Sequence, residues 1–191
     1  AREKIGINYP GTIFLFFGII RKDKGIEYLF KAISFLKDKD FKVLIAGGLF
    51  DYQESEILNL VEKLEIKEKV ILRLGYIEES QVYFYFYASD VLVLPYIKIY
   101  TGGSGPLLKE AAICKKPSIV SDVSEMGRLV KENKMGLIAQ PENPQSLAEK
   151  MEEFLEMPET ERKKMGENAF LVANTWQKMA KEYLDLYKKI I

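Results

Sequence analysis

The chain has 191 residues, of which 48% are hydrophobic and 29% charged, so it can form one globular domain with its own core. Its 28 basic and 28 acidic residues balance, which does not favour nucleic acid as a partner. The sequence has no histidine and one cysteine, Cys114, and this excludes a histidine-dependent nucleophile, a histidine-containing zinc site and an internal disulfide.

The sequence also bears on location. No apolar run approaches the roughly 20 residues that a membrane span needs. The first residues do not form a secretory signal, and a single cysteine fits a reducing compartment. We therefore expect a cytoplasmic protein without a transmembrane segment.

Strand and helix patterns alternate along the chain. Short apolar runs predict six strands, at residues 12–17, 41–46, 70–74, 90–94, 117–121 and 135–139. Helical patterns lie between and after them, at residues 25–37, 53–64, 79–88, 106–114, 125–132 and 144–156. Uniformly apolar strands are typical of a parallel sheet covered on both faces. The alternation predicts an α/β fold: a doubly wound, Rossmann-like parallel six-stranded sheet with helices on both faces.

The pattern changes after Pro158. Residues 159–173 and 176–191 predict two further helices with no strand between them. This helical tail, 159–191, either packs on its own sheet or reaches another domain. No linker or internal repeat interrupts the chain, so residues 1–191 are expected to form a single domain.

The loop after the fourth strand has the pattern of an anion-binding site. It runs from Pro95 into a helix that is expected to begin at Pro106. Its small residues before that helix are Gly102, Gly103, Ser104 and Gly105. Glycines let a ligand approach the backbone, and the unpaired N–H groups of a helix N-terminus favour negative charge. We therefore expect a phosphate group to bind here.

Glu110 lies one turn inside that helix, on the same side as Pro106. Helical side chains lean toward the N-terminus, so its carboxylate is expected to point at whatever the loop holds. Phosphates on the loop amides and ribose hydroxyls on the acid would suit a nucleotide.

The loop after the first strand, residues 18–25, carries three cations between two glycines. Arg21, as a bidentate donor, and Lys24, as a point charge, could clamp a diphosphate. Taken alone, the same pattern is more typical of a solvated turn.

The loops after the second and third strands add weaker signals. Gly48 is expected in a tight turn that allows close backbone approach, and Tyr76 or Ile77 could flank a base or simply pack. Because the carboxyl ends of parallel strands meet at one edge of a sheet, all four loops are expected to converge on a nucleotide-type ligand. The chain lacks G-x-G-x-x-G after its first strand and has no Walker lysine, which disfavours a dinucleotide dehydrogenase and a P-loop NTPase.

The order of these motifs resembles the C-terminal, donor-binding domain of GT-B fold glycosyltransferases, in particular glycosyltransferase family 4 (glycosyl transferases group 1). The resemblance covers nearly the whole chain. The segments that carry it are residues 16–29, 43–48, 72–77, 88–96, 104–111, 116–123, 133–138 and 143–148.

The resemblance implies transfer of a sugar from a nucleotide-diphosphate sugar, with UDP or GDP as the nucleotide, to an acceptor, with retention of configuration. It implies no metal and no other cofactor. The residues that match the family's catalytic positions are Arg21, Lys24 and Glu110. Those that match its donor-binding positions are Gly18, Gly48, Tyr76, Ile77, Gly102, Gly103, Ser104, Gly105, Pro106 and Leu107.

The resemblance also implies an N-terminal, acceptor-binding domain beyond these residues, which could bring the enzyme to the membrane surface. The isolated chain is then expected to be inactive. Two positions differ from the family pattern: Gly102 stands where a first loop glutamate is common, and Ile19 where the clamp arginine is commonest. The missing acid leaves an alternative open, a non-catalytic sugar-nucleotide-binding or scaffold module on the same fold. A sugar-nucleotide epimerase is a further, weaker one.

Overall fold

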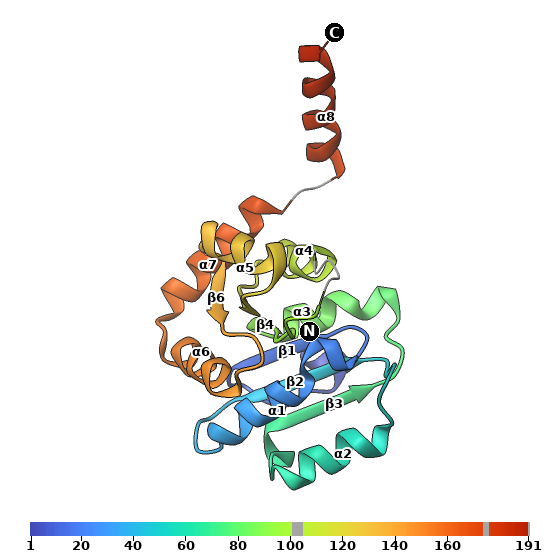
Figure 1. The fold of residues 1–191 in the computed structure, drawn as a ribbon, viewed down its shortest axis with the longest axis vertical. Helices are drawn as coiled ribbons and strands as arrows, with labels where there is room; N and C mark the ends of the chain where they lie inside the picture. Colours follow the sequence, from blue (N-terminus) through green and yellow to red (C-terminus); the bar gives the residue numbers. More distant parts are fainter. Residues whose placement is uncertain (101–104, 174–175, 191) are drawn as a thin grey trace.

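The computed structural model describes residues 1–100, 105–173 and 176–190. Within them, six strands form one parallel sheet in the order β3-β2-β1-β4-β5-β6 (Figure 1). The strands are β1 (Ile13–Phe17), β2 (Lys42–Gly47), β3 (Val70–Leu74), β4 (Val91–Leu94), β5 (Ser118–Ser121) and β6 (Gly136–Ala139). The predicted Rossmann-like sheet is confirmed, and every predicted strand is present with ends within one residue of the expected positions.

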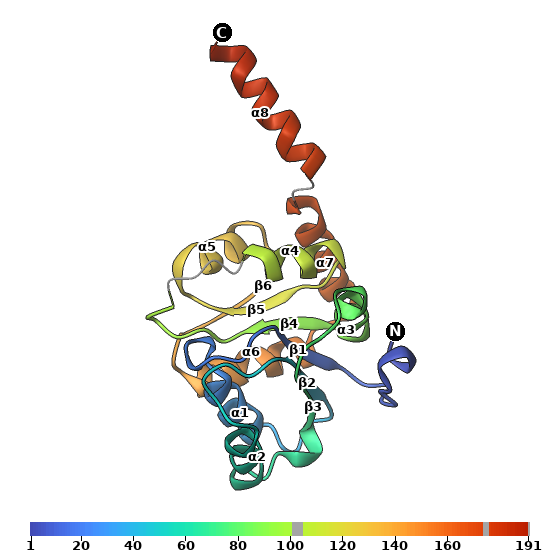
Figure 2. The ribbon, with the colours of Figure 1, turned by 90° about the vertical axis from the view of Figure 1, so that its right-hand side faces the viewer.

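Helices cover both faces of the sheet. They are α1 (Ile26–Phe35), α2 (Glu54–Lys63), α3 (Val82–Ala88), α4 (Gly105–Ile113), α5 (Ser124–Glu132), α6 (Pro144–Glu156), α7 (Glu159–Val172) and α8 (Trp176–Ile190). One core cluster joins α1, α2 and α6 to the sheet, and a second joins α3, α4, α5 and α7 to its other face. The two groups lie on opposite sides of the strands (Figure 2).

The first strand shows why the chain folds this way. All five of its residues are buried, and they alternate between the two cores: Phe14 and Phe16 belong to one, Leu15 and Phe17 to the other. A strand that is apolar on both faces is stable only when both faces are covered, which is the condition that a doubly wound fold meets.

Local signals set the helix ends. Asn143 accepts a hydrogen bond from the backbone N–H of Ser146 at 3.0 Å and caps α6, which has Pro144 at its first position. Pro158 precedes α7. The helix α1 begins at Ile26 because Gly25, with φ of 70°, ends a short 3-10 turn at that point.

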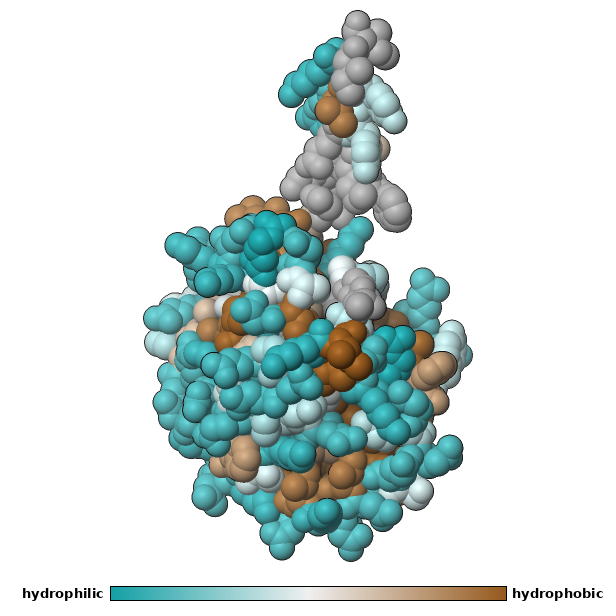
Figure 3. All heavy atoms as spheres, in the orientation of Figure 1, coloured by the Kyte–Doolittle hydropathy of each residue, from teal (hydrophilic) through white to brown (hydrophobic). Residues whose placement is uncertain are grey.

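The two helices of the tail differ. Gly166 of α7 packs against the backbone of Lys115, next to the end of α4, so α7 belongs to the body of the domain. By contrast, α8 extends away from it (Figures 1, 2 and 3) and exposes Tyr183, Leu184 and Tyr187. None of the helices in the described ranges is both long and apolar enough to cross a lipid bilayer.

Candidate functional site

The order of the strands locates the candidate site. From β1 the chain adds β2 and β3 on one side and then β4, β5 and β6 on the other side, so the order of the strands reverses between β1 and β4. Ligands of open α/β sheets bind at such a reversal. The loops that follow these two strands meet there. The backbone N–H of Ile97 donates to the carbonyl of Asp23 at 3.1 Å. Gly25 approaches Pro95 so closely that a Cβ would clash with the Pro95 carbonyl oxygen, so glycine is required.

Lys24 is the half-buried cation of this site. Its ammonium nitrogen lies 5.9 Å from the centroid of the Tyr96 ring, and that ring is fully buried and packs on Tyr100 at 4.3 Å. Burial lowers the pKa of Lys24, and the nearby charge of Arg21 lowers it further. Within the described ranges, no carboxylate forms an ion pair with Lys24.

Gly18 and Leu107 lie beside this lysine. Gly18 has φ of 101°, and a Cβ built there would lie 3.4 Å from the Lys24 nitrogen and 3.6 Å from a methyl group of Leu107. Three of the residues selected from the sequence, two on the loop after β1 and one on α4, are therefore brought together at the reversal point.

Arg21 is engaged by a residue that the sequence reasoning did not select. Its Nε donates to Oδ1 of Asp23 at 3.0 Å, and its Nη2 donates to Oδ2 at 2.6 Å. The hydrogen bonds to Asp23, and then its charge, raise the pKa of Arg21. The Arg-Lys-Asp spacing in a tight turn is the one sequence signal that could have indicated this pair.

The second and third loops lie directly beside the first. A Cβ on Gly47 would clash with the carbonyl oxygen of Gly18, and the N–H of Gly75 donates to the Gly47 carbonyl at 3.0 Å. Gly48, the residue selected from the sequence, is different, since the nearest atom to a Cβ there would be the Gly75 oxygen at 4.0 Å. A methyl group would therefore fit at Gly48 without a clash, so the fold does not require glycine at this position.

Tyr76 and Ile77 have different surroundings. The Tyr76 side chain is 79% exposed, whereas Ile77 is half-buried against the core. Each of the loops that follow the first four strands exposes one large apolar side chain; these are Ile19, Phe50, Tyr76 and Ile99. Together they place apolar surface around the carboxyl edge of the sheet.

Glu110 lies on α4, which begins at Gly105, one residue before the expected start. One of its carboxylate oxygens, Oε2, is buried and has no hydrogen-bond partner within the described ranges. The carboxylate lies against α3, because a hydrogen bond with Glu110 is the main cause of a raised pKa for Tyr83. A buried carboxylate oxygen without a donor is costly, so Glu110 is ready to accept a hydrogen bond. Gly102, Gly103 and Ser104 lie outside the described residues.

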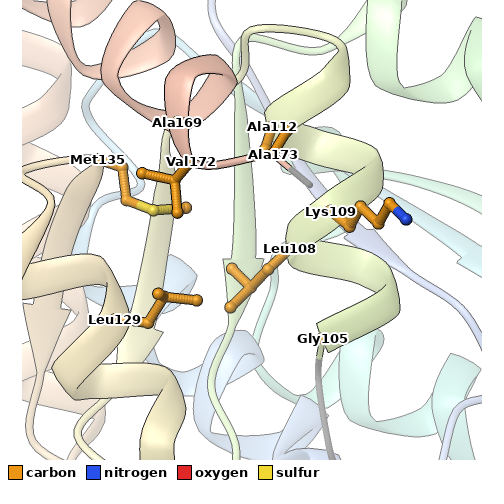
Figure 4. A pocket seen from close by; sticks show the side chains of 9 residues that line it. All are labelled: Gly105, Leu108, Lys109, Ala112, Leu129, Met135, Ala169, Val172 and Ala173. Atoms are coloured by element: carbon orange, nitrogen blue, oxygen red, sulfur yellow. The ribbon is translucent and has the colours of Figure 1, made fainter. Parts of the chain in front are cut away.

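The opposite flank of α4 borders an apolar hollow of about 230 Å³ (Figure 4). It lies between α4, α5 and α7, with Leu108, Leu129, Met135 and Val172 around it, and the Lys109 side chain points away from it. The residues that line the hollow are uncharged apart from Lys109, so no lining side chain offers a phosphate a charged group within it.

Known proteins resemble this chain in sequence and in fold. Residues 1–172 match the family described as glycosyl transferases group 1. The chain is 28% identical to an uncharacterized glycosyltransferase of Methanocaldococcus jannaschii, over 98% of this chain and 47% of that protein. Sucrose-phosphate synthase of Thermosynechococcus elongatus has the same fold, with a TM-score of 0.81 at 23% identity over 99% of this chain and 48% of that one.

A further solved structure, Anabaena HepE in complex with UDP, matches with a TM-score of 0.78 at 16% identity, over 99% of this chain and 50% of that one. The chain thus spans about half the length of each of these proteins. The chain therefore belongs to the glycosyl transferases group 1 family, and its Rossmann-like domain has the fold that these solved structures share.

Proposed function

We propose that this chain is the donor-binding half of a retaining, family 4 glycosyltransferase, which transfers a sugar from a nucleoside diphosphate to an acceptor. The observation that carries the proposal is Lys24. A half-buried ammonium beside Gly18, at the reversal point of the sheet and without a carboxylate partner in the described residues, is stabilised when an anion binds next to it.

The leaving diphosphate is the group that this site would stabilise. Lys24 would act as a point charge and Arg21 as a planar donor, so the negative charge that develops as the glycosidic bond breaks is balanced by side chains. The N-terminal end of α4, with Gly105, Pro106 and Leu107, would supply backbone N–H groups to the same phosphates. This chemistry needs no metal ion.

The nucleoside would lie across α3 and α4. The unpartnered Oε2 of Glu110 suits a ribose hydroxyl. Gly48, on the loop after β2, leaves space for another part of the nucleoside. Tyr76 offers an exposed ring for the base. The complex of HepE with UDP supports a uridine nucleotide, with guanosine as the second candidate.

The acceptor would bind to the other half of the enzyme. The four apolar side chains at the sheet edge are suited to a surface that another domain covers when the site closes. On this proposal the isolated chain binds the donor nucleotide but transfers no sugar. The complete enzyme would act in the cytoplasm, at the membrane surface where its other half associates with it.

Calorimetric titration of the chain with UDP, GDP and ADP tests the proposal. We expect at least one to bind, and Lys24→Met to weaken binding at least tenfold, because it removes a charge-assisted contact. Lys31→Met is the matched control, since Lys31 is an exposed lysine that also lies over a tyrosine ring, that of Tyr28 at 5.7 Å. Failure of all three nucleotides at millimolar concentration would overturn the proposal.

A second measurement separates an enzyme from a non-catalytic binding module, the alternative that Gly102 favours by replacing the family's first loop glutamate. The chain joined to its natural N-terminal half is assayed for sugar transfer from the nucleotide that binds. Turnover by the joined protein, and none by the chain alone, is the expected result. Tight binding without turnover would favour the module.

A further inference from the structure

Arg21 and Asp23 form a side-on pair, in which Asp23 occupies one edge of the guanidinium. The two parallel hydrogen bonds, at 3.0 and 2.6 Å, run from Nε and Nη2 to the two carboxylate oxygens. Both side chains are partly exposed, at 37% and 29%. An exposed pair of this kind adds little to folding stability, so its geometry calls for another explanation.

The pair leaves a second edge of the guanidinium open. Nη1 of Arg21 has no hydrogen-bond acceptor in the part of the chain that the structure describes, and Nη2 carries a second N–H that points away from Asp23. A guanidinium has five N–H donors, so it can hold one carboxylate at its side and two phosphate oxygens at its end at the same time. Asp23 therefore does not compete with an anion for the same donors.

Asp23 is itself fixed to both loops of the candidate site. It lies in the 3-10 turn Lys22–Lys24, and its carbonyl oxygen accepts the N–H of Ile97 from the loop after β4 at 3.1 Å. The N–H of Lys22 is held by the carboxylate of Asp51 on the loop after β2, at 3.0 Å. The carboxylate that accepts the hydrogen bonds of Arg21 thus belongs to a backbone segment that is hydrogen-bonded to the loops after β2 and β4.

The negative charge of Asp23 also offsets the repulsion between Arg21 and Lys24. Arg21 and Lys24 are like charges on one turn, and the pKa of Lys24 is lowered by Arg21 and raised by Asp23. With Asp23 in place, the two cations can stay close together before an anion binds.

We propose that Asp23 is a positioning residue: it holds Arg21 by its side edge, so that the end edge is preoriented toward the diphosphate of the donor. This inference rests on the function proposed above. Without Asp23, the long arginine side chain would be free to rotate, and binding would have to pay for ordering it.

A double-mutant cycle tests the role. Affinity for the nucleoside diphosphate that binds best is measured for the parent chain, Asp23→Asn, Arg21→Met and the double variant. We expect Asp23→Asn to weaken binding about fivefold when Arg21 is present, which is the cost of ordering one long side chain. With Arg21→Met in place, the same substitution should leave binding unchanged or tighten it, because it removes a negative charge near an anion.

The sign of the effect decides between the alternatives. If Asp23→Asn binds the nucleotide more tightly while Arg21 is present, Asp23 competes with the ligand. If Asp23→Asn weakens binding equally with Arg21 and with Arg21→Met, its role is merely structural. Either result overturns the inference. Thermal unfolding of each variant checks that the fold is kept. If the parent binds no nucleotide at all, the proposed function itself has failed, and this result is distinct from both others.

Discussion

The ammonium of Lys24 lies over the ring of Tyr96, 5.9 Å from its centroid, and this contact joins the loops that follow β1 and β4. The buried tyrosine provides the lysine with a favourable electrostatic contact but not with a counter-charge. Lys24 is thus a half-buried cation whose pKa is lowered, and two consequences can be measured.

The first consequence is a dependence of stability on pH. In the folded chain the pKa of Lys24 lies below its unfolded value, so at neutral pH the fold carries the full cost of a desolvated ammonium. As the pH rises from the folded to the unfolded pKa, that cost disappears. Lys24→Met should therefore gain unfolding free energy relative to the parent at pH 7, and the gain should shrink toward pH 10.

Urea unfolding of the parent, Lys24→Met and the control Lys31→Met at both pH values checks this prediction. The exposed control should show a smaller difference between the two pH values. A constant difference between parent and Lys24→Met across the alkaline range would contradict it.

The second consequence appears on ligand binding. An anion beside Lys24 favours the protonated amine, so its pKa rises in the complex; affinity should fall, and proton uptake on binding should appear, as the pH rises through the lowered pKa of the free chain. Titration of UDP in two buffers with different ionisation enthalpies measures the protons taken up. Proton uptake that persists undiminished in Lys24→Met would assign it to another group.

Glu110 should act on the nucleoside and not on the phosphates. Its Oε2 is buried without a donor in the described ranges, so a ribose hydroxyl would satisfy it, and Glu110→Ala should weaken UDP binding roughly tenfold or more. Pyrophosphate, which has no ribose, should bind the variant and the parent equally. Tyr83→Phe removes the hydrogen bond that holds the carboxylate and should weaken UDP about threefold. Equal losses for UDP and pyrophosphate would exclude the ribose role.

The neighbours Gly47 and Gly48 should separate folding from binding. Gly47 has φ of 143° and contacts the Gly18 carbonyl, so Gly47→Ala should destabilise the fold by about 3 kcal/mol.

Gly48 has space for a methyl group, so Gly48→Ala should lower the free energy of unfolding by less than about 1 kcal/mol. The same substitution should weaken nucleotide binding if the donor occupies that space. Urea unfolding and UDP titration of both variants measure the two effects. A stable Gly48→Ala chain with unchanged affinity would remove Gly48 from the site.

The sheet could be predicted from the sequence because runs such as Phe14–Phe16 are apolar at every position, and only a strand covered on both faces buries them all. The convergence of Gly18, Lys24 and Leu107 followed from parallel strands alone, since their loops must then share an edge. These inferences need only periodicity and topology.

The pairing of side chains could not be predicted in the same way. The hydrogen bonds from Arg21 to Asp23 depend on the dihedral angles of one 3-10 turn, and the contact of Glu110 with Tyr83 depends on how α4 packs on α3. In the aromatic run 83–87, Tyr85 and Phe86 are buried whereas Tyr83 and Tyr87 are exposed. Only the structure shows that Tyr83 is the exposed ring that contacts Glu110.

Tyr76 provides the last prediction. Its ring is 79% exposed at the carboxyl edge of the sheet, next to Gly75, and nothing in folding requires an aromatic side chain there. If the base of the donor stacks on it, Tyr76→Ala should cost about 1–3 kcal/mol of binding, a tenfold or larger loss for UDP. Tyr76→Phe should retain most of the affinity, because the stacking surface is kept.

Two controls make this prediction specific. Tyr87→Ala removes another exposed tyrosine, 55% exposed on α3, and should leave UDP affinity unchanged. Pyrophosphate should bind Tyr76→Ala and the parent alike, since it has no base to stack. Because both side chains are more than half exposed, all three variants should unfold close to the parent temperature. A loss of pyrophosphate binding, or an equal loss for Tyr87→Ala, would show that the ring supports the loop rather than the base.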